Sequence, residues 1–294
     1  MIRLCKYFLL TINFCFLFSQ FPLDLTPDEI TEPYYLPVLT DSDFLLTVSA
    51  STNTNWSVVG GESSTITIIV DGESESYNQD IVLYAGEEIH QYNCSLGYLN
   101  AGDHTIEFLF NYEKSSNTAD LVHIESIELT DIQSLPIDSD IFFYSPILYG
   151  RDLLSWNEST HTDIPLIMWH DISIVGVNKK ITYSVIFSNE DSRIGLGLSD
   201  LMHSYGRTTD IEWVYEVTLS PSGNILNETF QGPAHVTTQF QGDKLGKHPI
   251  LKNATLNCNF IDSGTSYYKF FLSPILTSDT SYTRQMIMDE NPWT

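Results

Sequence analysis

The chain has 294 residues, with 13 lysines and arginines against 38 aspartates and glutamates and a formal net charge of −25. Such an acidic surface repels phosphate groups, which excludes nucleic acid as a partner and disfavours an anionic membrane. No Lys or Arg occurs between Lys6 and Lys114. This acidity is typical of an extracellular protein that binds calcium, or of a protein whose charge only keeps it soluble.

Residues 1–20 have the features of a secretory signal peptide. Arg3 and Lys6 form a short positive segment, which an apolar run over residues 8–18 follows. That run is shorter than the about 20 residues that a membrane-spanning helix needs. The sequence therefore predicts a secreted, extracellular protein with no stable membrane span. An uncleaved anchor stays open, because the cleavage site lacks an Ala-x-Ala pattern.

Five Asn-x-Ser/Thr sequons support export, since each accepts a glycan only in the secretory lumen. They begin at Asn55, Asn93, Asn157, Asn227 and Asn253. Once the signal is removed, the only cysteines are Cys94 and Cys258. Two thiols in an oxidising compartment can pair, and the sequence leaves open whether this pair forms a disulfide between the two halves of the chain.

The first half of the chain predicts an antiparallel β-sandwich. Residues 21–42 are rich in Pro and acidic side chains, which predicts an extended lead-in. Residues 43–131 contain segments rich in β-branched and aromatic residues, separated by turn sequences such as Asp71-Gly72, with no helical period. Strands are predicted at 44–49, 64–70, 81–84, 88–96, 105–112 and 122–130. Strands of this length and spacing are typical of a sandwich.

Two short sequence motifs in this half are similar to those of a known fold. Asp71-Gly72 is followed by Tyr77-Asn78-Gln79-Asp80, and later by Leu99-Asn100-Ala101-Gly102-Asp103-His104-Thr105-Ile106. Together they resemble the galactose-binding-like jelly roll used by many non-catalytic carbohydrate-binding modules, over residues 43–131 only. The resemblance implies sugar binding through loop aromatics or a bound calcium, although the same fold also serves structural roles. It points to Trp56, Tyr77, Asn78 and Asp80 as carbohydrate-binding residues.

The second half predicts another β-rich domain. Residues 132–143 are a predicted linker, and residues 144–294 contain predicted strands at 166–172, 181–187, 210–219, 236–240 and 266–272, with no helical pattern before about Thr283. The whole chain is therefore predicted to be all-β, with two sandwich-like domains after the signal peptide. The final residues, Asn291-Pro-Trp-Thr294, follow an apolar turn, which is typical of a domain truncated at its C-terminus.

Residues 209–219 alternate between two faces, with Ile211, Trp213, Tyr215, Val217 and Leu219 on one and Asp210, Glu212, Val214 and Glu216 on the other. The period of two predicts a long strand that buries Ile211 and Trp213 and exposes Asp210 and Glu212. Same-face neighbours on a strand lie about 6.5–7 Å apart at Cα, and two carboxylates this close raise each other's pKa unless a cation lies between them. Three interpretations stay open: a calcium site, an acid/base pair, or a salt bridge to Arg207. Asp191 is the third predicted calcium ligand.

An acid/base pair would suit an enzyme that cleaves glycans, because such enzymes place two carboxyl groups about 5–5.5 Å or about 6.5–9.5 Å apart. A lyase would instead need a histidine base beside a charge-neutralising group. Trp156 lies beside a sequon, so we expect it to be exposed, where its ring suits a sugar platform. The candidate catalytic residues are Asp210, Glu212, Glu190, Arg207, His161 and His235, with His248 as a further histidine.

No zinc motif, phosphate-binding loop or nucleophile elbow occurs, so we expect no nucleotide or redox cofactor. Two functions remain. The first is a secreted, acidic, N-glycosylated protein that binds carbohydrate, or a surface or matrix glycoprotein. The alternative is a polysaccharide-active enzyme, a glycoside hydrolase or lyase, with its site in the second domain.

Overall fold

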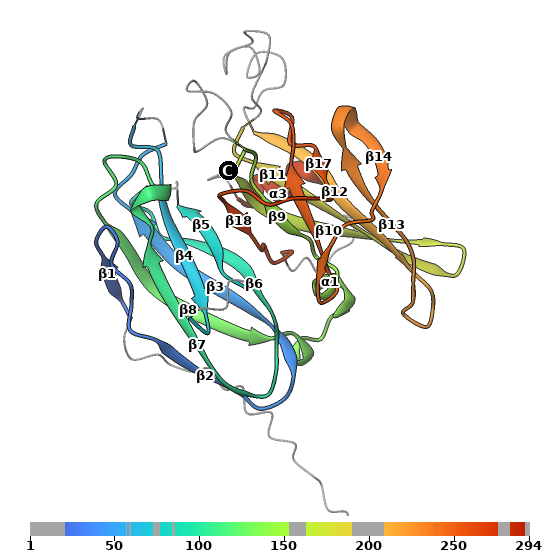
Figure 1. Cartoon of the computed structure of the whole chain (residues 1–294), viewed down its shortest axis with the longest axis horizontal. Coiled ribbons are helices and arrows are strands. Elements are labelled where there is room, and N and C mark those ends of the chain that lie inside the picture. Colours follow the sequence, from blue (N-terminus) through green and yellow to red (C-terminus); the bar gives the residue numbers. More distant parts are fainter. Residues whose placement is uncertain are drawn as a thin grey trace, which may run out of the picture.

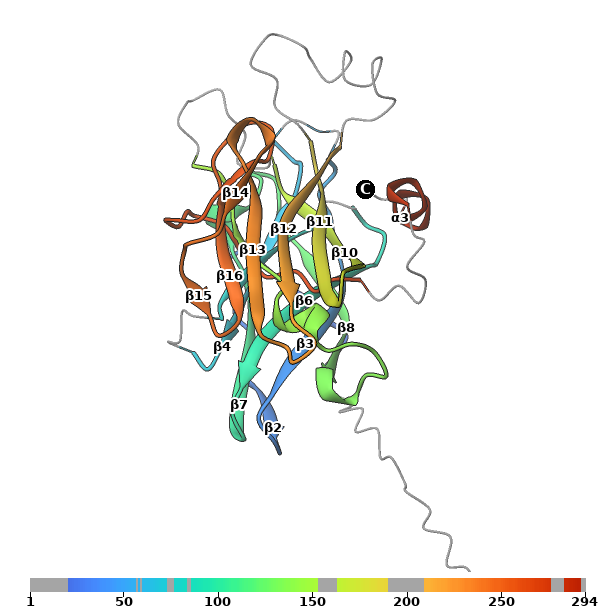
Figure 2. The same ribbon diagram turned by 90° about the vertical axis from the view of Figure 1, so that its right-hand side faces the viewer.

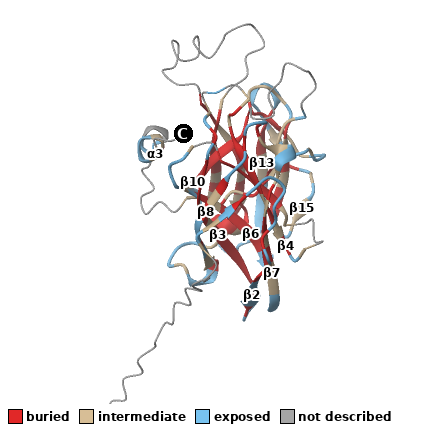
Figure 3. Ribbon diagram, turned by 90° about the vertical axis from the view of Figure 1, so that its left-hand side faces the viewer, coloured by how far each residue is buried: buried red, intermediate tan, exposed pale blue. Residues whose placement is uncertain are grey.

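The computed structural model describes residues 21–56, 58, 60–72, 77–83, 86–152, 163–189, 209–275 and 283–291. The fold is all-β, as predicted. Four sheets stack as two sandwiches that lie side by side, one from each half of the chain (Figure 1). Buried residues fill the strands of both sandwiches (Figure 3). Within the described ranges, no helix is long and apolar enough to cross a membrane.

The first sandwich packs two four-stranded antiparallel sheets around an apolar core. Alternate residues of its strands, such as Leu46, Val48, Ile66 and Phe108, point into that core. One sheet has the order β1 (Leu23–Leu25), β8 (Val122–Asp131), β3 (Ser42–Thr52), β6 (His90–Leu99). The other has the order β2 (Tyr34–Val38), β7 (Gly102–Phe110), β4 (Ser64–Val70), β5 (Gln79–Leu83).

The prediction of an extended lead-in over residues 21–42 is wrong. β1 pairs with β8 and β2 pairs with β7, so the segment supplies an edge strand to each sheet. Tyr34, Leu36 and Val38 alternate with exposed residues and are buried, which is enough to anchor the strand. Pro37 is tolerated there because an edge strand can lose one backbone donor.

The second sandwich has a long outer sheet and a smaller inner sheet beside the first sandwich. Figure 2 shows the strands of the outer sheet side by side, in the order β10 (Pro165–Val175), β11 (Asn178–Phe187), β12 (Asp210–Leu219), β13 (Ile225–Gly232), β14 (Val236–Gln239). The inner sheet has β15 (Lys244–Leu245), β16 (His248–Asn253), β9 (Ile147–Tyr149) and β18 (Lys269–Phe270), with β17 (Phe260–Ile261) on β16. The short helices are η1 (Tyr112–Lys114), η2 (Ile132–Ser134), α1 (Asp140–Phe143), η3 (Pro233–His235) and α3 (Arg284–Glu290).

A β-bulge in β12 changes which residues face the core. Tyr183 pairs with Tyr215 and Ser184 pairs with Trp213, so Val214 is an extra residue in the strand. Val214 and Tyr215 are both fully buried, whereas Trp213 is only half-buried and lies outside the core cluster. The prediction that Trp213 is a core residue is therefore wrong.

The same bulge reverses the faces of the residues before it, because a shift of one residue moves every side chain to the other side. Asp210 pairs with Phe187 and Glu212 pairs with Val185, and both partners are core residues. Asp210 is consequently only 8% exposed. At the N-terminal end of β12, the face that was predicted to be exposed to solvent therefore points into the sandwich.

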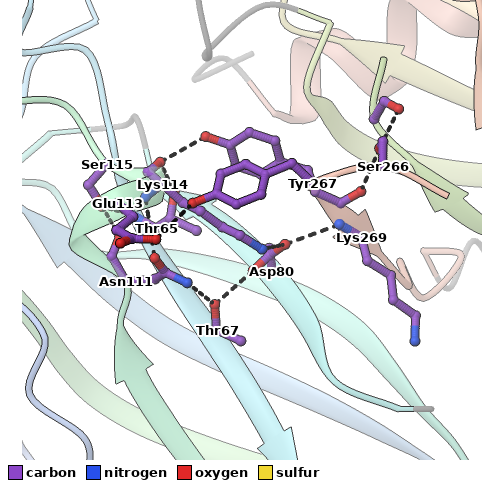
Figure 4. A network of polar contacts seen from close by, with 12 residues as sticks. Thr65, Thr67, Asp80, Asn111, Glu113, Lys114, Ser115, Ser266, Tyr267 and Lys269 are labelled. Atoms are coloured by element: carbon purple, nitrogen blue, oxygen red, sulfur yellow. Dashed lines mark hydrogen bonds and ion pairs between the residues drawn. The ribbon is translucent and has the colours of Figure 1, made fainter. Parts of the chain in front are cut away.

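The two sandwiches are joined by backbone and side-chain hydrogen bonds along the chain that follows β17. The Ser95 N–H donates to the Phe271 carbonyl at 2.7 Å, and the Ser273 N–H donates to the Asn93 carbonyl at 3.1 Å. A polar network adds to this junction around Asp80 (Figure 4). The two halves of the chain are therefore packed against each other along this junction.

Cys94 and Cys258 are free, buried thiols, so the disulfide that the sequence left open does not form. The reason is their placement: Cys94 belongs to the core of the first sandwich and Cys258 to the core of the second. Burial raises the pKa of the Cys94 thiol. Burial raises the pKa of the Cys258 thiol as well, and the nearby Asp163 and Asp210 carboxylates add to the effect.

We expect neither thiol to react with a maleimide reagent in the folded protein, because only an accessible thiolate reacts readily. Both should react once the protein is denatured without reductant. Mass spectrometry of a chain lacking residues 1–20 measures this directly. Labelling of the native protein, or a mass lower by two hydrogens before labelling, would contradict the buried, unpaired thiols.

Candidate functional site

The four carbohydrate-binding residues predicted in the first sandwich have structural contacts. Asp80 is buried and accepts hydrogen bonds from Lys114 and the Lys269 backbone. The Asn78 side chain accepts a hydrogen bond from the Val70 N–H.

The two aromatic residues of this set are also packed. The Tyr77 ring lies against Gly97, where a Cβ atom would come within 2.3 Å of the ring, and Trp56 packs against the core of the second sandwich. The structure therefore places Trp56 and Asp80 at the junction between the sandwiches, whereas Tyr77 and Asn78 pack within the first sandwich.

Of the candidate catalytic residues, Glu212 and His235 meet in a polar cluster at one end of the second sandwich. Gln231 Nε2 donates to Glu212 Oε2 at 2.5 Å and lies 2.9 Å from His235 Nδ1. Glu212 Oε1 lies 3.5 Å and Asn259 Nδ2 lies 3.4 Å from the same ring nitrogen. Because an amide nitrogen can only donate, Nδ1 accepts, and the neutral ring carries its proton on Nε2.

The His235 ring is half-exposed, whereas Gln231 and Asn259 beneath it are buried. Its backbone is strained: Ala234 and His235 have φ of 59° and 60°, which residues other than glycine rarely adopt. Strain of this kind persists only where the surroundings fix it, and it is common at functional sites. The cluster therefore holds one imidazole N–H in a fixed direction.

Behind this cluster lies a buried acidic group. The Cys258 thiol hydrogen-bonds with Asp210, and Asp163 and Glu212 are close enough to raise its pKa further. Arg151 forms an ion pair with Asp163, with Nε 2.7 Å from Oδ2, and both side chains are almost inaccessible. The carboxylates of this end of the sandwich are thus partly neutralised by an arginine that the sequence did not indicate.

The remaining predicted site residues are placed elsewhere or are outside the described residues. His248 is buried, with Nδ1 2.9 Å from the Ser145 carbonyl oxygen and Nε2 3.2 Å from Asp43 Oδ1, so it ties the sandwiches together. Outside the described residues lie Glu190, Asp191, Arg207, His161, Trp156 and Asn157. Among those that are described, no group of three or more His, Cys, Asp or Glu side chains could hold a metal ion.

A groove of about 890 Å³, which the sequence did not indicate, lies on the outer face of the first sandwich. Its floor is the sheet face formed by β8, β3 and β6. Glu128, Thr47 and Asn93 stand side by side across these three strands, because Thr47 pairs with each of the other two. Thr47 Oγ1 donates to Asn93 Oδ1 at 2.7 Å, which orients the amide and leaves its N–H groups as donors.

The lining of this groove comes from both halves of the chain. Its aliphatic part includes Pro37 and Leu39 of the first half and Pro274 and Ile275 of the second. Leu39 is 84% exposed at the rim. The groove therefore combines a polar row of carboxylate, hydroxyl and amide with aliphatic side chains.

The described sequons differ sharply in accessibility. Asn55 and Asn227 are exposed, so a glycan at either would extend into solvent. Asn93 lines the groove, and its sequon partner Ser95 is buried. Asn253 is only 2% exposed, so we expect this acceptor to carry no glycan in the folded protein.

We expect glycopeptide mapping of protein from a secretory host to find glycans at Asn55 and Asn227 and none at Asn253. Asn55→Gln and Asn227→Gln should each remove one glycan mass, and Asn253→Gln should remove none. A folded protein that carries a glycan on Asn253 would contradict the buried position of that side chain.

No family model matches the chain, and no curated protein matches it. Among solved structures, the C-terminal domain of EclA, titled a sugar-binding protein, matches 37% of this chain and 76% of its own, with 13% identity and a TM-score of 0.26. NLPPya in complex with mannosamine matches 48% of this chain and 73% of its own, with 13% identity and a TM-score of 0.32. A GH26-CBM35 β-(1,4)-mannanase of Podospora anserina matches 45% of this chain and only 37% of its own, with 13% identity and a TM-score of 0.26. Similarities this low do not assign a function to the chain.

Proposed function

We propose that the chain is a secreted, N-glycosylated protein that binds carbohydrate in the groove on the first sandwich. The observation that carries this proposal is the row of Glu128, Thr47 and Asn93 in a groove that is also lined by aliphatic side chains. Sugar hydroxyls both donate and accept hydrogen bonds, so a carboxylate, a hydroxyl and an amide match them. The C–H faces of a sugar ring pack against aliphatic surface.

Two properties narrow the ligand class. The groove volume of about 890 Å³ lies within the range of small-molecule sites and exceeds what a single sugar fills. The net charge of −25 and the Glu128 carboxylate on the floor disfavour sulfated or uronic acid polymers. The proposed ligand is therefore a neutral oligosaccharide that lies along the groove.

A glycan array carrying neutral and anionic oligosaccharides tests the proposal, followed by calorimetry on the best ligand. We expect Glu128→Gln and Thr47→Val each to weaken binding by about tenfold, the effect of losing a hydrogen bond to a charged or well-oriented group. Glu125→Gln is the matched control, because Glu125 is exposed on the same strand but does not line the groove. An array with no neutral ligand removes the proposal. If both groove variants bind the ligand as tightly as the wild type does, the protein still binds carbohydrate, but the groove is not its binding site.

The polar cluster of Glu212, Gln231, His235 and Asn259 favours a second candidate, a polysaccharide-active enzyme. A half-exposed imidazole whose Nδ1 accepts from two side-chain amides, one of which is also bonded to Glu212, is an arrangement suited to proton transfer. A depolymerisation screen with His235→Ala and Glu212→Gln tests it, and activity that survives both changes would contradict it.

We also propose that Asp210, Glu212 and Asp191 bind calcium. Carboxylate oxygens are the ligands that calcium prefers, and Asp210 and Glu212 share one face of β12. It is tested by comparing the melting temperature in calcium and in chelator.

A further inference from the structure

Two neighbouring hairpins end together at one end of the outer sheet of the second sandwich. The first tip, residues 172–178, joins β10 to β11, and the second tip, residues 219–227, joins β12 to β13. The tips are neighbours because Leu219 pairs with Lys179 at the base of the first and with Ile225 in the second. In Figure 1 the first hairpin, drawn yellow-green, projects away from the rest of the molecule.

The tips expose aliphatic side chains and carry no charge. Although 17% of the whole chain is charged, neither range contains an Asp, Glu, Lys or Arg. Each of the aliphatic residues at the tips is between 40% and 76% exposed, and they are Ile174, Val175, Val177, Ile225 and Leu226. Several exposed aliphatic side chains at two neighbouring turns, with no charge among them, are typical of a surface that is covered in use.

We propose that the two hairpin tips insert side by side into the interfacial region of a zwitterionic lipid bilayer. Their shape favours a lipid surface over a folded partner. A stable protein interface buries about 800 Å² on each partner over matched surfaces, whereas two narrow convex turns suit a medium that deforms around them. Aliphatic side chains flanked by Ser, Gly and Asn turns can enter this region without burying a charge.

The charges around the tips decide which lipid headgroup fits. Lys179 and Lys180 follow the first tip directly, but Lys179 pairs with Asp138 and Asp140, and Lys180 pairs with Glu216. No net positive patch therefore attracts anionic headgroups. With a net charge of −25, the whole protein is repelled by an anionic surface, so insertion depends on the apolar tips alone.

Co-sedimentation of the full chain with phosphatidylcholine vesicles tests the proposal. We expect the wild type to bind them, and to bind vesicles containing phosphatidylserine less tightly at low salt. Ile174→Asp and Leu226→Asp should each lower the vesicle partition coefficient by about tenfold or more, because a carboxylate enters the bilayer at high cost. Ile89→Asp is the matched control, since Ile89 is 49% exposed on the first sandwich, outside the tips. All three positions are exposed, so the variants should melt like the wild type.

Asn227 is a predicted glycan acceptor beside Leu226, so Asn227→Gln is measured in parallel. Binding by that variant alone would support insertion by the tips and show that a glycan masks them. The proposal is overturned if neither form binds vesicles, or if Ile174→Asp and Ile89→Asp bind equally. It is equally overturned if the wild type ignores vesicles but forms dimers that Ile174→Asp dissociates in analytical ultracentrifugation, because the tips are then a protein interface.

Discussion

Replacing Asp80 by alanine is expected to lower the free energy of unfolding by about 3–5 kcal/mol, the usual effect of breaking a buried ion pair from one side. The Asp80 side chain is 2% exposed, and its Oδ2 lies 2.7 Å from Lys114 Nζ. It also accepts hydrogen bonds from Thr67 Oγ1 at 2.7 Å and from the Lys269 N–H at 3.1 Å. Removing the carboxylate leaves all three donors without this acceptor (Figure 4).

The loss should extend beyond the first sandwich, because the network spans the junction. Lys114 Nζ lies 4.8 Å from the centre of the Tyr267 ring and 5.4 Å from that of Tyr268, both of which belong to the second half. The Tyr268 hydroxyl donates to the Lys114 carbonyl at 2.9 Å. A lysine without its carboxylate should therefore also loosen the contact between the halves.

Urea denaturation of Asp80→Ala, of Lys114→Met and of the double variant measures the coupling. The double variant should be less destabilised than the sum of the single changes, because no charge is then left buried without a partner. Glu113→Ala is the control, since the only hydrogen bond to its carboxylate in this network is a 3.4 Å contact from the exposed Tyr267 hydroxyl. Asp80→Ala with wild-type stability but lost sugar binding would return Asp80 to the ligand-binding role that the sequence indicated.

Local sequence patterns were sufficient to predict most strands of the first sandwich. β3, β4, β7 and β8 lie where β-branched and aromatic runs meet turn residues, because their inward side chains are apolar regardless of distant contacts. β9 and β16 are different. They are short, they pair in parallel across about a hundred intervening residues, and their burial depends on both sheets being present. No local period marks such strands.

The candidate site shows a similar division. The sequence singled out Glu212 and His235, and the structure brings them together. The sequence did not indicate Asn259 or Arg151, because an isolated amide or guanidinium gains its role only from the fold. The groove on the first sandwich was missed for the same reason. Thr47, Asn93 and Glu128 are far apart in the chain, and only strand pairing aligns them.

Because of the β12 bulge, we expect alanine substitutions of two nearby aromatic residues, Trp213 and Tyr215, to differ in their effect on stability. Tyr215→Ala should cost about 3–5 kcal/mol of unfolding free energy, as for other large buried aromatics. Tyr215 is fully buried, its ring lies 6.1 Å from that of Tyr183, and its hydroxyl donates to Glu228. Trp213→Ala should cost only about 1 kcal/mol, the usual effect at a position outside the core.

A strand without the bulge would give a different result. Strict alternation would place Trp213 and Tyr215 on one buried face, and the two alanine variants would then be about equally destabilised, since both remove a large aromatic ring. Urea denaturation of both variants therefore decides whether Val214 is the extra residue. The same measurement tests the placement of Asp210 and Glu212, because the shift that turns Trp213 outward turns these two carboxylates inward. Equal losses would return both carboxylates to a solvated face and remove the structural basis of an acid/base or calcium site on β12.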